Sequence, residues 1–390
     1  MLKKIVFALI LILTLNSCKK ETSKKIALPT KIEKPKSIFF VDFPKISKQE
    51  IETYYKEIES FYNSKIDIDN YSGGFLVAKN GQILFEDYQG FSNYSNKTEI
   101  TKNTPLHLAS ISKVLTASAI LRMIDQQQLS LNDTFQKYFP EFPFEKITIR
   151  TLLNHRSGLP NYAYFTDDKD IWDKSIVLTN ENVLELLNTK NISLEFRPDS
   201  KFSYCNTNYA LLALLIEKVS GLSFSDAMKK LIFDPLEMNN TFVFEFEKQK
   251  DTVSQSYKSK WEKIPYDHLD AVYGDKNIYS TPQDLLKFDL ATYSDKFFSN
   301  ELREEIFKGY SYERPGVKNY GLGIRLNEWD DSETLFYHNG WWHGNTTSYT
   351  TLKNEKVCII ALSNKYTRKV YQAKKLSSLF GNYPFEIEED

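Results

Sequence analysis

The stretch Ser110-Ile111-Ser112-Lys113 begins a long apolar segment whose periodicity predicts a helix over residues 111–128. In a helix, positions i and i+3 lie on one face, so Ser110 and Lys113 are expected to be neighbours. Ser110 would then lie at the end of the helix where free backbone N–H groups and the dipole favour negative charge. A desolvated Lys can act as a base for a serine hydroxyl. Ser-x-x-Lys is also common by chance, and Ser often caps helices.

The segments that follow Lys113 are also predicted to be mostly helical. Apolar periodicity predicts helices over residues 149–154 and 209–219, and Gly221 supplies a C-terminal cap for the second. One more helix is expected from Ser223, and another begins at Thr281-Pro282, where Pro occupies the favoured first helical position. The centre of the chain is therefore a helical region.

Strand patterns occur on both sides of this helical region. A capping box at Ser47 begins an N-terminal helix, and the segments 73–78 and 83–88 then flank Asn80-Gly81, a strong hairpin signal. After residue 315, strands are predicted over 320–326, 334–338, 346–352 and 357–362, followed by an amphipathic helix over 368–379. The predicted fold class is α/β (α+β), with an antiparallel sheet formed from N- and C-terminal strands, flanked by helices, and an inserted, mostly helical region.

Composition and charge exclude several classes of protein. The chain has 390 residues, of which 41% are hydrophobic and 26% charged, a profile typical of a globular protein. Residues 19–36 hold seven Lys against two Glu although the whole chain has a formal charge of −1, so the body is acidic and nucleic-acid binding is not expected. The five His are scattered, so neither a metal nor another cofactor is predicted. Cys205 and Cys358 could form a disulfide, although buried free thiols are the commoner arrangement.

The N-terminus has the pattern of a targeting segment. Lys3 and Lys4 precede an apolar run over residues 5–13, which is too short to span a bilayer and fits a secretory signal. Leu15-Asn16-Ser17-Cys18 resembles a bacterial lipobox, which predicts a lipoprotein signal peptide over 1–18 and lipidation of Cys18. An ordinary signal peptide and an uncleaved anchor are the alternatives. We expect a flexible Lys-rich tether over 19–45, one catalytic domain over 46–390, and a monomer anchored to a bacterial membrane, facing the periplasm or the cell surface.

Two later segments contain further candidate site residues. Tyr204 and Asn206 stand just before the predicted helix over 209–219, and His338-Asn339-Gly340-Trp341 follows a predicted strand. A Tyr close to a Lys can transfer protons, an Asn can orient an amide, and a Gly permits close approach of the backbone. Taken singly, Tyr204 could be a core residue, Asn206 a helix cap and His338 a surface residue.

In this order, the three segments resemble the Ser-x-x-Lys, Tyr-x-Asn and Lys/His-x-Gly motifs of the penicillin-recognising serine hydrolases. The resemblance is closest to the branch of class C β-lactamases and D,D-carboxypeptidases or esterases, and it covers about residues 50–385. Further matching segments are 74–81, 129–133, 147–160, 279–285 and 320–323. The resemblance implies the serine β-lactamase/D,D-peptidase fold and an acyl-enzyme reaction on a small-molecule or peptide substrate.

The resemblance also implies a role for each matching residue. Ser110 would attack the acyl carbon, while Lys113 and Tyr204 would transfer the proton. The implied substrate-binding residues are Asn206, His338, Gly340 and Trp341, with the backbone N–H groups of Ser110 and Trp341 as the oxyanion hole. His155 falls in a segment that is structural in the family, so it is left out of the site.

The sequence departs from β-lactamases at positions that bear on the substrate. Where those enzymes have Lys, this chain has His338, and a neutral imidazole supplies less fixed positive charge for a carboxylate. Trp341 and Trp342 replace smaller residues and could narrow the cleft. We therefore expect a serine hydrolase of the cell envelope acting on a D-amino-acid peptide, ester or related acyl compound. The alternatives are a β-lactamase, or a non-catalytic lipoprotein that binds peptidoglycan fragments or a partner.

Overall fold

The computed structural model describes residues 38–39, 41–68 and 71–386. The predicted signal peptide, Cys18 and most of the predicted tether lie outside these residues. The described end of that tether packs on the body, because the rings of Phe39 and Phe297 lie 5.3 Å apart and those of Phe43 and Tyr293 lie 5.4 Å apart. Within the described part of the chain, no helix has the length and apolar character needed to cross a membrane.

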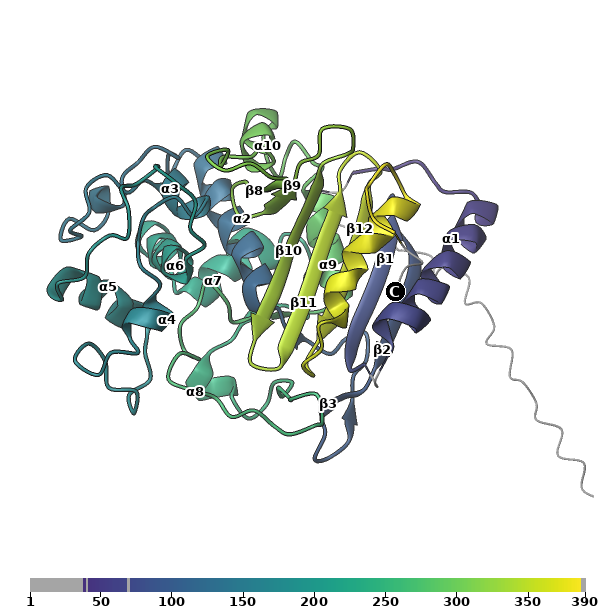
Figure 1. Cartoon of the computed structure of the whole chain (residues 1–390), viewed down its shortest axis with the longest axis horizontal. Helices are drawn as coiled ribbons and strands as arrows, with labels where there is room; N and C mark the ends of the chain where they lie inside the picture. Colours follow the sequence, from purple (N-terminus) through teal and green to yellow (C-terminus); the bar gives the residue numbers. More distant parts are fainter. Residues whose placement is uncertain (1–37, 40, 69–70, 387–390) are drawn as a thin grey trace, which may run out of the picture.

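A seven-stranded antiparallel sheet joins the two ends of the body (Figure 1). Its strand order is β2-β1-β12-β11-β10-β9-β8, so the N-terminal hairpin pairs with the last strand of the chain. The strands are β1 (Gly73–Lys79), β2 (Gln82–Gln89), β8 (Lys318–Tyr320), β9 (Arg325–Asn327), β10 (Leu335–Trp342), β11 (Asn345–Leu352) and β12 (Val357–Ser363). The predicted fold class is confirmed.

The strand predicted over residues 320–326 is divided in two by a turn between β8 and β9. The Gly321 N–H donates to the Ile324 carbonyl at 2.8 Å, which closes the turn. Gly323 has a φ of 91°, and a Cβ there would lie 2.3 Å from the Cβ of Ala117. The turn therefore packs closely against the helix that contains Ala117, and Gly is needed at this point of contact.

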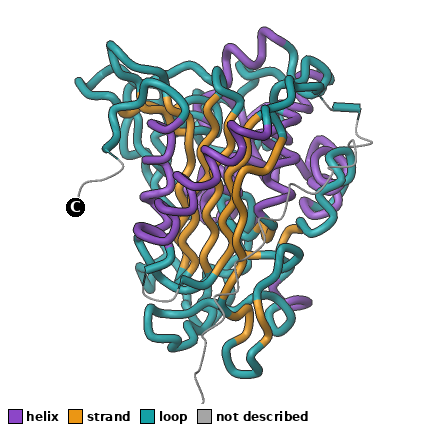
Figure 2. Tube along the Cα trace, turned by 90° about the vertical axis from the view of Figure 1, so that its right-hand side faces the viewer, coloured by secondary structure: helices purple, strands orange, loops and turns teal. Residues whose placement is uncertain are grey.

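Helices cover both faces of the sheet. On one face lie α1 (Lys48–Phe61) and the C-terminal helix η5 (Lys369–Leu379), which is a 3-10 helix. On the other lie α2 (Ser112–Asp125) and α9 (Pro282–Ala291), and α6 (Asn206–Ser220) packs against α2. Alternation along β1 explains this layering. Phe75 and Val77 point into the hydrophobic core under α1 and η5, whereas Leu76 and Ala78 point into the core on the opposite face, under α2 and α9. Figure 2 shows the strands lying between these helices.

The segment between β2 and β8 forms the inserted region. Its helices are η2 (Ala109–Ile111), α2, η3 (Phe135–Lys137), α3 (Ile149–Leu153), α4 (Tyr162–Phe165), α5 (Asn180–Thr189), α6, α7 (Phe224–Met228), η4 (Lys229–Phe233), α8 (Phe246–Gln249), α9 and α10 (Asn300–Ile306). It also contains β3 (Phe91–Asn93) paired with β4 (Thr98–Glu99), and a small sheet of β5 (Leu106–His107), β7 (Ile278–Ser280) and β6 (Phe242–Val243). The short helix η1 (Tyr62–Ile66) follows α1. Cys205 and Cys358 are both buried free thiols.

Candidate active site

Ser110 and Lys113 are brought together where the 3-10 helix η2 leads into α2. The Lys113 Nζ donates to the Ser110 Oγ at 3.2 Å, as the i, i+3 spacing predicts. Lys113 is completely buried, whereas Ser110 is partly exposed. The Lys113 ammonium also donates to the backbone carbonyl of Asp275 at 2.7 Å. The arrangement presents a serine hydroxyl to the outside and a basic group behind it.

The turn that carries Ser110 has an unusual backbone conformation. Ala109 has a φ of 48°, the left-handed region that a residue with a Cβ seldom adopts. Its N–H donates to the Nδ1 of His107 at 3.0 Å, and the Nε2 of His107 lies 3.0 Å from the Asn277 Oδ1. Burial lowers the pKa of His107 to about 4, so the ring is neutral and its Nε2–H donates to Asn277. His107 thus holds the turn at Ala109 that carries Ser110. In the sequence it was only one of five scattered His.

Strand β10 closes the site behind this turn. The Thr347 hydroxyl donates to the Leu108 carbonyl at 2.8 Å, which ties β11 to the residue just before Ala109. A Cβ on Gly340 would lie 2.2 Å from the Thr347 Oγ1 and 2.6 Å from the Leu108 oxygen. Gly340 therefore allows the strand to approach the turn. The side chain of the next residue, Trp341, is 64% exposed, and its Nε1–H donates to the His343 carbonyl at 2.9 Å.

Buried polar atoms without protein partners occur in two of the motif segments among the described residues. The Lys113 Nζ lies 5.1 Å from the centroid of the Tyr204 ring, which places this Tyr beside Ser110 and Lys113. Among the described residues, the buried Tyr204 hydroxyl, Asn206 Oδ1 and Asn339 Oδ1 have no hydrogen-bond partner. Because buried polar groups are normally satisfied, such atoms in a known family motif are candidates for binding a substrate. Tyr204 and Asn206 lie at the N-terminal end of α6, as predicted.

His338, which the resemblance implies to be a substrate-binding residue, has a fully buried ring. Its Nδ1 lies 2.9 Å from the Asn339 carbonyl, which can only accept, so Nδ1 carries the proton. Its Nε2, 3.1 Å from the Tyr320 hydroxyl, then accepts from that group. Burial, Arg325 and Lys113 lower the pKa of His338 well below its usual range. The neutral ring has no free donor left for a substrate carboxylate.

Arg325, which the sequence did not indicate as a site residue, places a positive charge beside Tyr204. The guanidinium carbon of Arg325 lies 4.6 Å from the Tyr204 ring centroid and 5.7 Å from that of Tyr320. Arg325 lies on β9 and pairs with Tyr337, the neighbour of His338 on β10. The segment 320–323 matched the family, but only the pairing of β9 with β10 shows that a residue just beyond it lies next to the site.

His155 packs beneath Tyr204 and not in the open site. Its ring centroid lies 4.3 Å from that of Tyr204, and its Nδ1 accepts from the backbone N–H of Cys205 at 3.2 Å. Burial and the charge of Lys113 lower the pKa of His155 well below its usual range. A neutral ring that supports the Tyr204 segment fits the structural role expected for this residue.

One group of side chains in the described chain has the spacing of metal ligands. Possible ligand atoms of Asp267, Asp270 and His343 lie within 4.8 Å of one another. The His343 Nε2 is 3.1 and 3.0 Å from the two Asp270 carboxylate oxygens, and the Trp342 Nε1–H donates to the same carboxylate at 2.7 Å. Because these contacts already account for the Asp270 oxygens, we assign the group to the support of the β10–β11 turn and not to a cofactor.

Comparisons with known proteins agree with this geometry. The chain is 30% identical over 355 residues to Penicillin-binding protein 4* of Bacillus subtilis, covering 86% of this chain and 78% of the relative. It is 24% identical over 322 residues to the teichoic acid D-alanine hydrolase of Staphylococcus aureus, covering 81% and 75% of the two chains. The structure of an octameric penicillin-binding protein homologue from Pyrococcus abyssi superposes with a TM-score of 0.68 at 26% identity, covering 86% of this chain and 77% of the other.

The family assignment rests on most of the chain. The sequence profile described as Beta-lactamase matches residues 68–378, which includes the whole sheet and the inserted helical region. The matched span contains the Ser-x-x-Lys, Tyr-x-Asn and His-x-Gly segments, and the structure places Ser110, Lys113 and Tyr204 together within it. The chain is a serine hydrolase of the Beta-lactamase family.

Proposed function

We propose that this enzyme hydrolyses a D-amino-acid peptide, ester or related acyl compound of the cell envelope through an acyl-enzyme. The observation that carries the proposal is the 3.2 Å contact between the Lys113 Nζ and the Ser110 Oγ, beside the ring of Tyr204, whose hydroxyl has no hydrogen-bond partner among the described residues. A nucleophile in contact with a buried basic group is the arrangement required for covalent acyl transfer. Ser110 is the proposed nucleophile.

The proposed reaction has two halves. The Ser110 oxygen bonds to the acyl carbon while its proton passes to the Lys113–Tyr204 pair, which then delivers a proton to the departing amine or alcohol. In the second half, water attacks the Ser110 ester, its proton passes through the same pair, and the Ser110 hydroxyl is restored. Lys113 is held in place by its two hydrogen bonds, so it can serve both halves of the reaction without moving.

Substrate binding is proposed to use backbone and side-chain groups around Ser110. The N–H groups of Ser110 and Trp341 form the oxyanion hole, which the close approach permitted by Gly340 supports. The unpartnered Oδ1 of Asn206 would accept from a substrate amide N–H. The exposed indole of Trp341 would form one wall of the cleft.

Arg325 is proposed to supply the positive charge that His338 does not. It contacts Tyr204 and Tyr320 through its guanidinium carbon, and its charge is one cause of the lowered pKa of His338. A guanidinium binds a carboxylate with two parallel hydrogen bonds, so it suits the free carboxylate of a terminal D-amino acid. His338 would then orient Tyr320 beside Arg325, through the bond between its Nε2 and the Tyr320 hydroxyl.

The names of the relatives support a D-amino-acid substrate and an envelope location. One relative is a teichoic acid D-alanine hydrolase and another is a penicillin-binding protein. The lipobox-like segment ending at Cys18 supports a lipid anchor, which would hold the enzyme at a membrane surface. We also propose a monomer, although the homologue from Pyrococcus abyssi is octameric.

A matched substrate panel tests the proposed function. The purified enzyme would receive D-alanyl and L-alanyl esters and amides, a peptide ending in D-Ala-D-Ala, and nitrocefin. Turnover of D-alanyl compounds with little turnover of their L counterparts supports the proposal. Faster hydrolysis of nitrocefin than of every D-alanyl compound would favour a β-lactamase, and no turnover or covalent labelling at all would favour the non-catalytic alternative.

A further inference from the structure

Lys113 depends on a second loop for its position. Besides its contact with Ser110, the Lys113 ammonium donates to the Asp275 carbonyl at 2.7 Å, which is the shorter of the two hydrogen bonds. Asp275 lies in the loop that precedes β7, more than 160 residues from Lys113 in sequence. A shift in this peptide would therefore move the Lys113 ammonium relative to Ser110.

This loop is held tightly at both ends. Gly274 has a φ of 90°, its carbonyl accepts from the Thr116 hydroxyl at 2.8 Å, and a Cβ on it would lie 2.5 Å from the Tyr209 carbonyl. On the other side, the Asn277 side chain donates to the Asp270 carbonyl at 2.6 Å and to the Val272 carbonyl at 2.9 Å. The conformation of the Asp275 peptide is thus specified by its neighbours.

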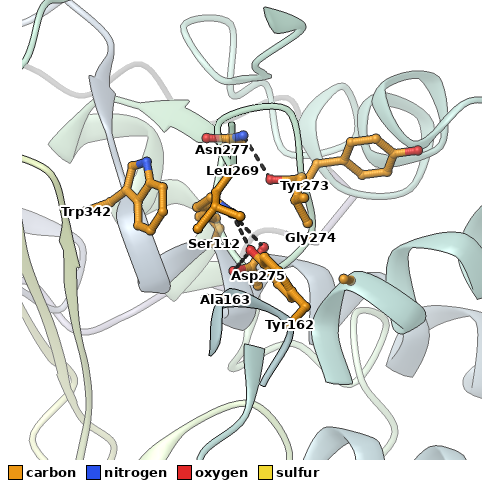
Figure 3. Close-up of polar contacts among 12 residues, drawn as sticks. Ser112, Tyr162, Ala163, Leu269, Tyr273, Gly274, Asp275, Asn277 and Trp342 are labelled. Atoms are coloured by element: carbon orange, nitrogen blue, oxygen red, sulfur yellow. Dashed lines mark hydrogen bonds and ion pairs between the residues drawn. The ribbon is translucent and has the colours of Figure 1, made fainter. Parts of the chain in front are cut away.

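Between these two anchors stands a second buried lysine. The side chain of Lys276 is 3% exposed, and its Nζ donates to the Tyr162 hydroxyl and lies 3.5 Å from the Asp275 Oδ1. The Tyr162 hydroxyl in turn donates to the Asp275 Oδ2 at 2.9 Å. The Lys276 ammonium also lies 4.6 Å from the Trp342 ring centroid. Figure 3 shows Tyr162 beside Asp275, with the indole of Trp342 across the cluster.

Burial of the Lys276 ammonium costs free energy unless its charge is paired. A buried charge must be paired to remain charged, and here the Asp275 carboxylate provides the pairing. Burial lowers the pKa of Lys276, the carboxylates of Asp275 and Asp270 oppose that change, and the charge of Lys113 adds to it. The last effect shows that the two lysines are close enough to repel each other.

We propose that Lys276 is a positioning residue for Lys113. Through its contacts with Asp275 and Tyr162, Lys276 fixes the Asp275 peptide, and its positive charge opposes the accumulation of further positive charge behind Ser110. This inference rests on the proposed role of Lys113 as the proton-transfer group. All three side chains of the Lys276–Tyr162–Asp275 cluster are buried, and none of them contacts Ser110 in the hydrogen bonds of the described residues. The effect of the cluster on the reaction therefore passes through the carbonyl that accepts from Lys113.

The charge environment sets the direction of the expected pH effect. Lys113 faces Ser110 on its own segment, the rings of Tyr204 and Tyr209 near and on α6, and the Asp275 peptide. Charge effects also link it to Lys276, to His155 before α4 and to His338 on β10. Lys276 faces Asp275 and Asp270 from its own segment, Tyr162 from α4 and Trp342 from β10, and its charge also reaches His107. Removal of the Lys276 charge would favour protonation nearby.

Two variants test the proposal through the rate at which Ser110 is labelled. Lys276→Met removes the charge at similar length, and Lys276→Met with Asp275→Asn removes the whole ion pair, so that no unpaired carboxylate is left in the core. In both, the second-order rate of fluorophosphonate labelling and kcat/KM for a D-alanyl ester should fall by about 10- to 100-fold, because a displacement of about 1 Å at the reacting groups has this effect. KM should change little in both variants, and in Lys276→Met, which loses only a positive charge, the acid limb of the kcat/KM profile should move to higher pH.

Lys353→Met is the matched control. Lys353 is a lysine whose side chain is 16% exposed, 3.7 Å from the Asp289 carboxylate and hydrogen-bonded to Thr292 at 2.7 Å, and it follows the far end of β11. It should lower the thermal midpoint without changing the labelling rate or the pH profile. If the folded double variant keeps at least half of the wild-type kcat/KM and Lys276→Met keeps the wild-type acid limb, Lys276 only fills space. A wild-type enzyme that is itself inactive would instead overturn the proposed function.

Discussion

The guanidinium of Arg325, on β9, lies over the ring of Tyr204, whose hydroxyl has no hydrogen-bond partner among the described residues. This contact places a positive charge next to the residue proposed to transfer protons. It also changes the assignment of the anionic end of the substrate, because the ring nitrogens of His338 are already occupied.

Replacement of Arg325 should separate substrates by their charge. Arg325→Met is expected to raise KM about tenfold or more for a peptide with a free terminal carboxylate, since a charge-assisted hydrogen bond contributes about 1.5–3 kcal/mol. A neutral ester of the same D-amino acid should show little change in KM. Arg325→Lys should recover part of the binding, and Arg314→Met, at an exposed position, is the control. Equal losses for charged and neutral substrates would show that Arg325 only supports the Tyr204 ring.

Acidification should destabilise the protein through its buried histidines. Burial lowers the pKa of His107 to about 4, and those of His155 and His338 well below the usual range, so the unfolded chain binds more protons as pH falls below about 6.5. Stability is therefore complete above the unfolded pKa and is lost as pH falls. From about pH 7 to pH 5, His107 alone should remove about 2 kcal/mol from the free energy of unfolding.

Urea unfolding at several pH values measures this effect. His107→Gln should reduce the slope of unfolding free energy against pH. The same depressed pKa predicts no activity limb from His338 near pH 6.5 with either charged or neutral substrates. A free energy of unfolding that is constant between about pH 7 and pH 5 would contradict the neutral, buried state of these rings.

Gly340→Ala should disturb the nucleophile turn directly. The added Cβ would lie 2.2 Å from the Thr347 Oγ1 and 2.6 Å from the Leu108 carbonyl, so β10 and the turn must separate. We expect kcat to fall by about tenfold or more, since small displacements at a reacting group are costly. Gly221→Ala is the control: its φ of 68° causes backbone strain, but no atom lies within 4 Å of its Cβ. If both variants lose stability but keep activity, the strand does not position Ser110.

Much of the fold could be predicted from residue periodicity and turn signals. The β1–β2 hairpin followed from Asn80-Gly81, and the C-terminal strands followed from short apolar runs separated by turns. The division of residues 320–326 could not be predicted in this way. It depends on the contact of Gly323 with Ala117 on α2, which is a long-range packing effect with no local signal.

The candidate site was predictable only in part, for a related reason. The contact between Ser110 and Lys113 followed from helical spacing within four residues. The contributions of His107, Arg325 and Lys276 arise from contacts between segments far apart in the chain, such as His107 with Asn277 and Lys276 with Tyr162. The burial of His338 likewise depends on packing against Tyr320, which its residue type alone does not indicate.

Cys18 should determine where the protein is found. Cys18→Ser removes the thiol of the lipobox-like segment that would carry the acyl anchor. Stable anchoring needs two signals, so loss of the acylated thiol should release the protein. The variant should move from the detergent-extracted membrane fraction to the soluble fraction, or accumulate unprocessed. A Ser17→Ala variant should still be processed and membrane-bound, since it keeps the thiol. A processed Cys18→Ser protein that stays in the membrane fraction would contradict lipid anchoring.

The central claim is that Ser110 forms the covalent intermediate, and intact-mass spectrometry with peptide mapping tests it most directly. Wild-type enzyme treated with a fluorophosphonate or a slowly hydrolysed D-alanyl ester should gain one adduct, and the adduct should map to Ser110. Ser110→Ala should gain none while its thermal midpoint stays within about 2 °C of the wild type, because only one partly exposed hydroxyl is removed. Ser118→Ala, in the same helix with its hydroxyl bonded to the Val114 carbonyl, should label normally. An adduct on folded Ser110→Ala, or at least a tenth of wild-type esterase activity in that variant, would show that Ser110 is not the nucleophile.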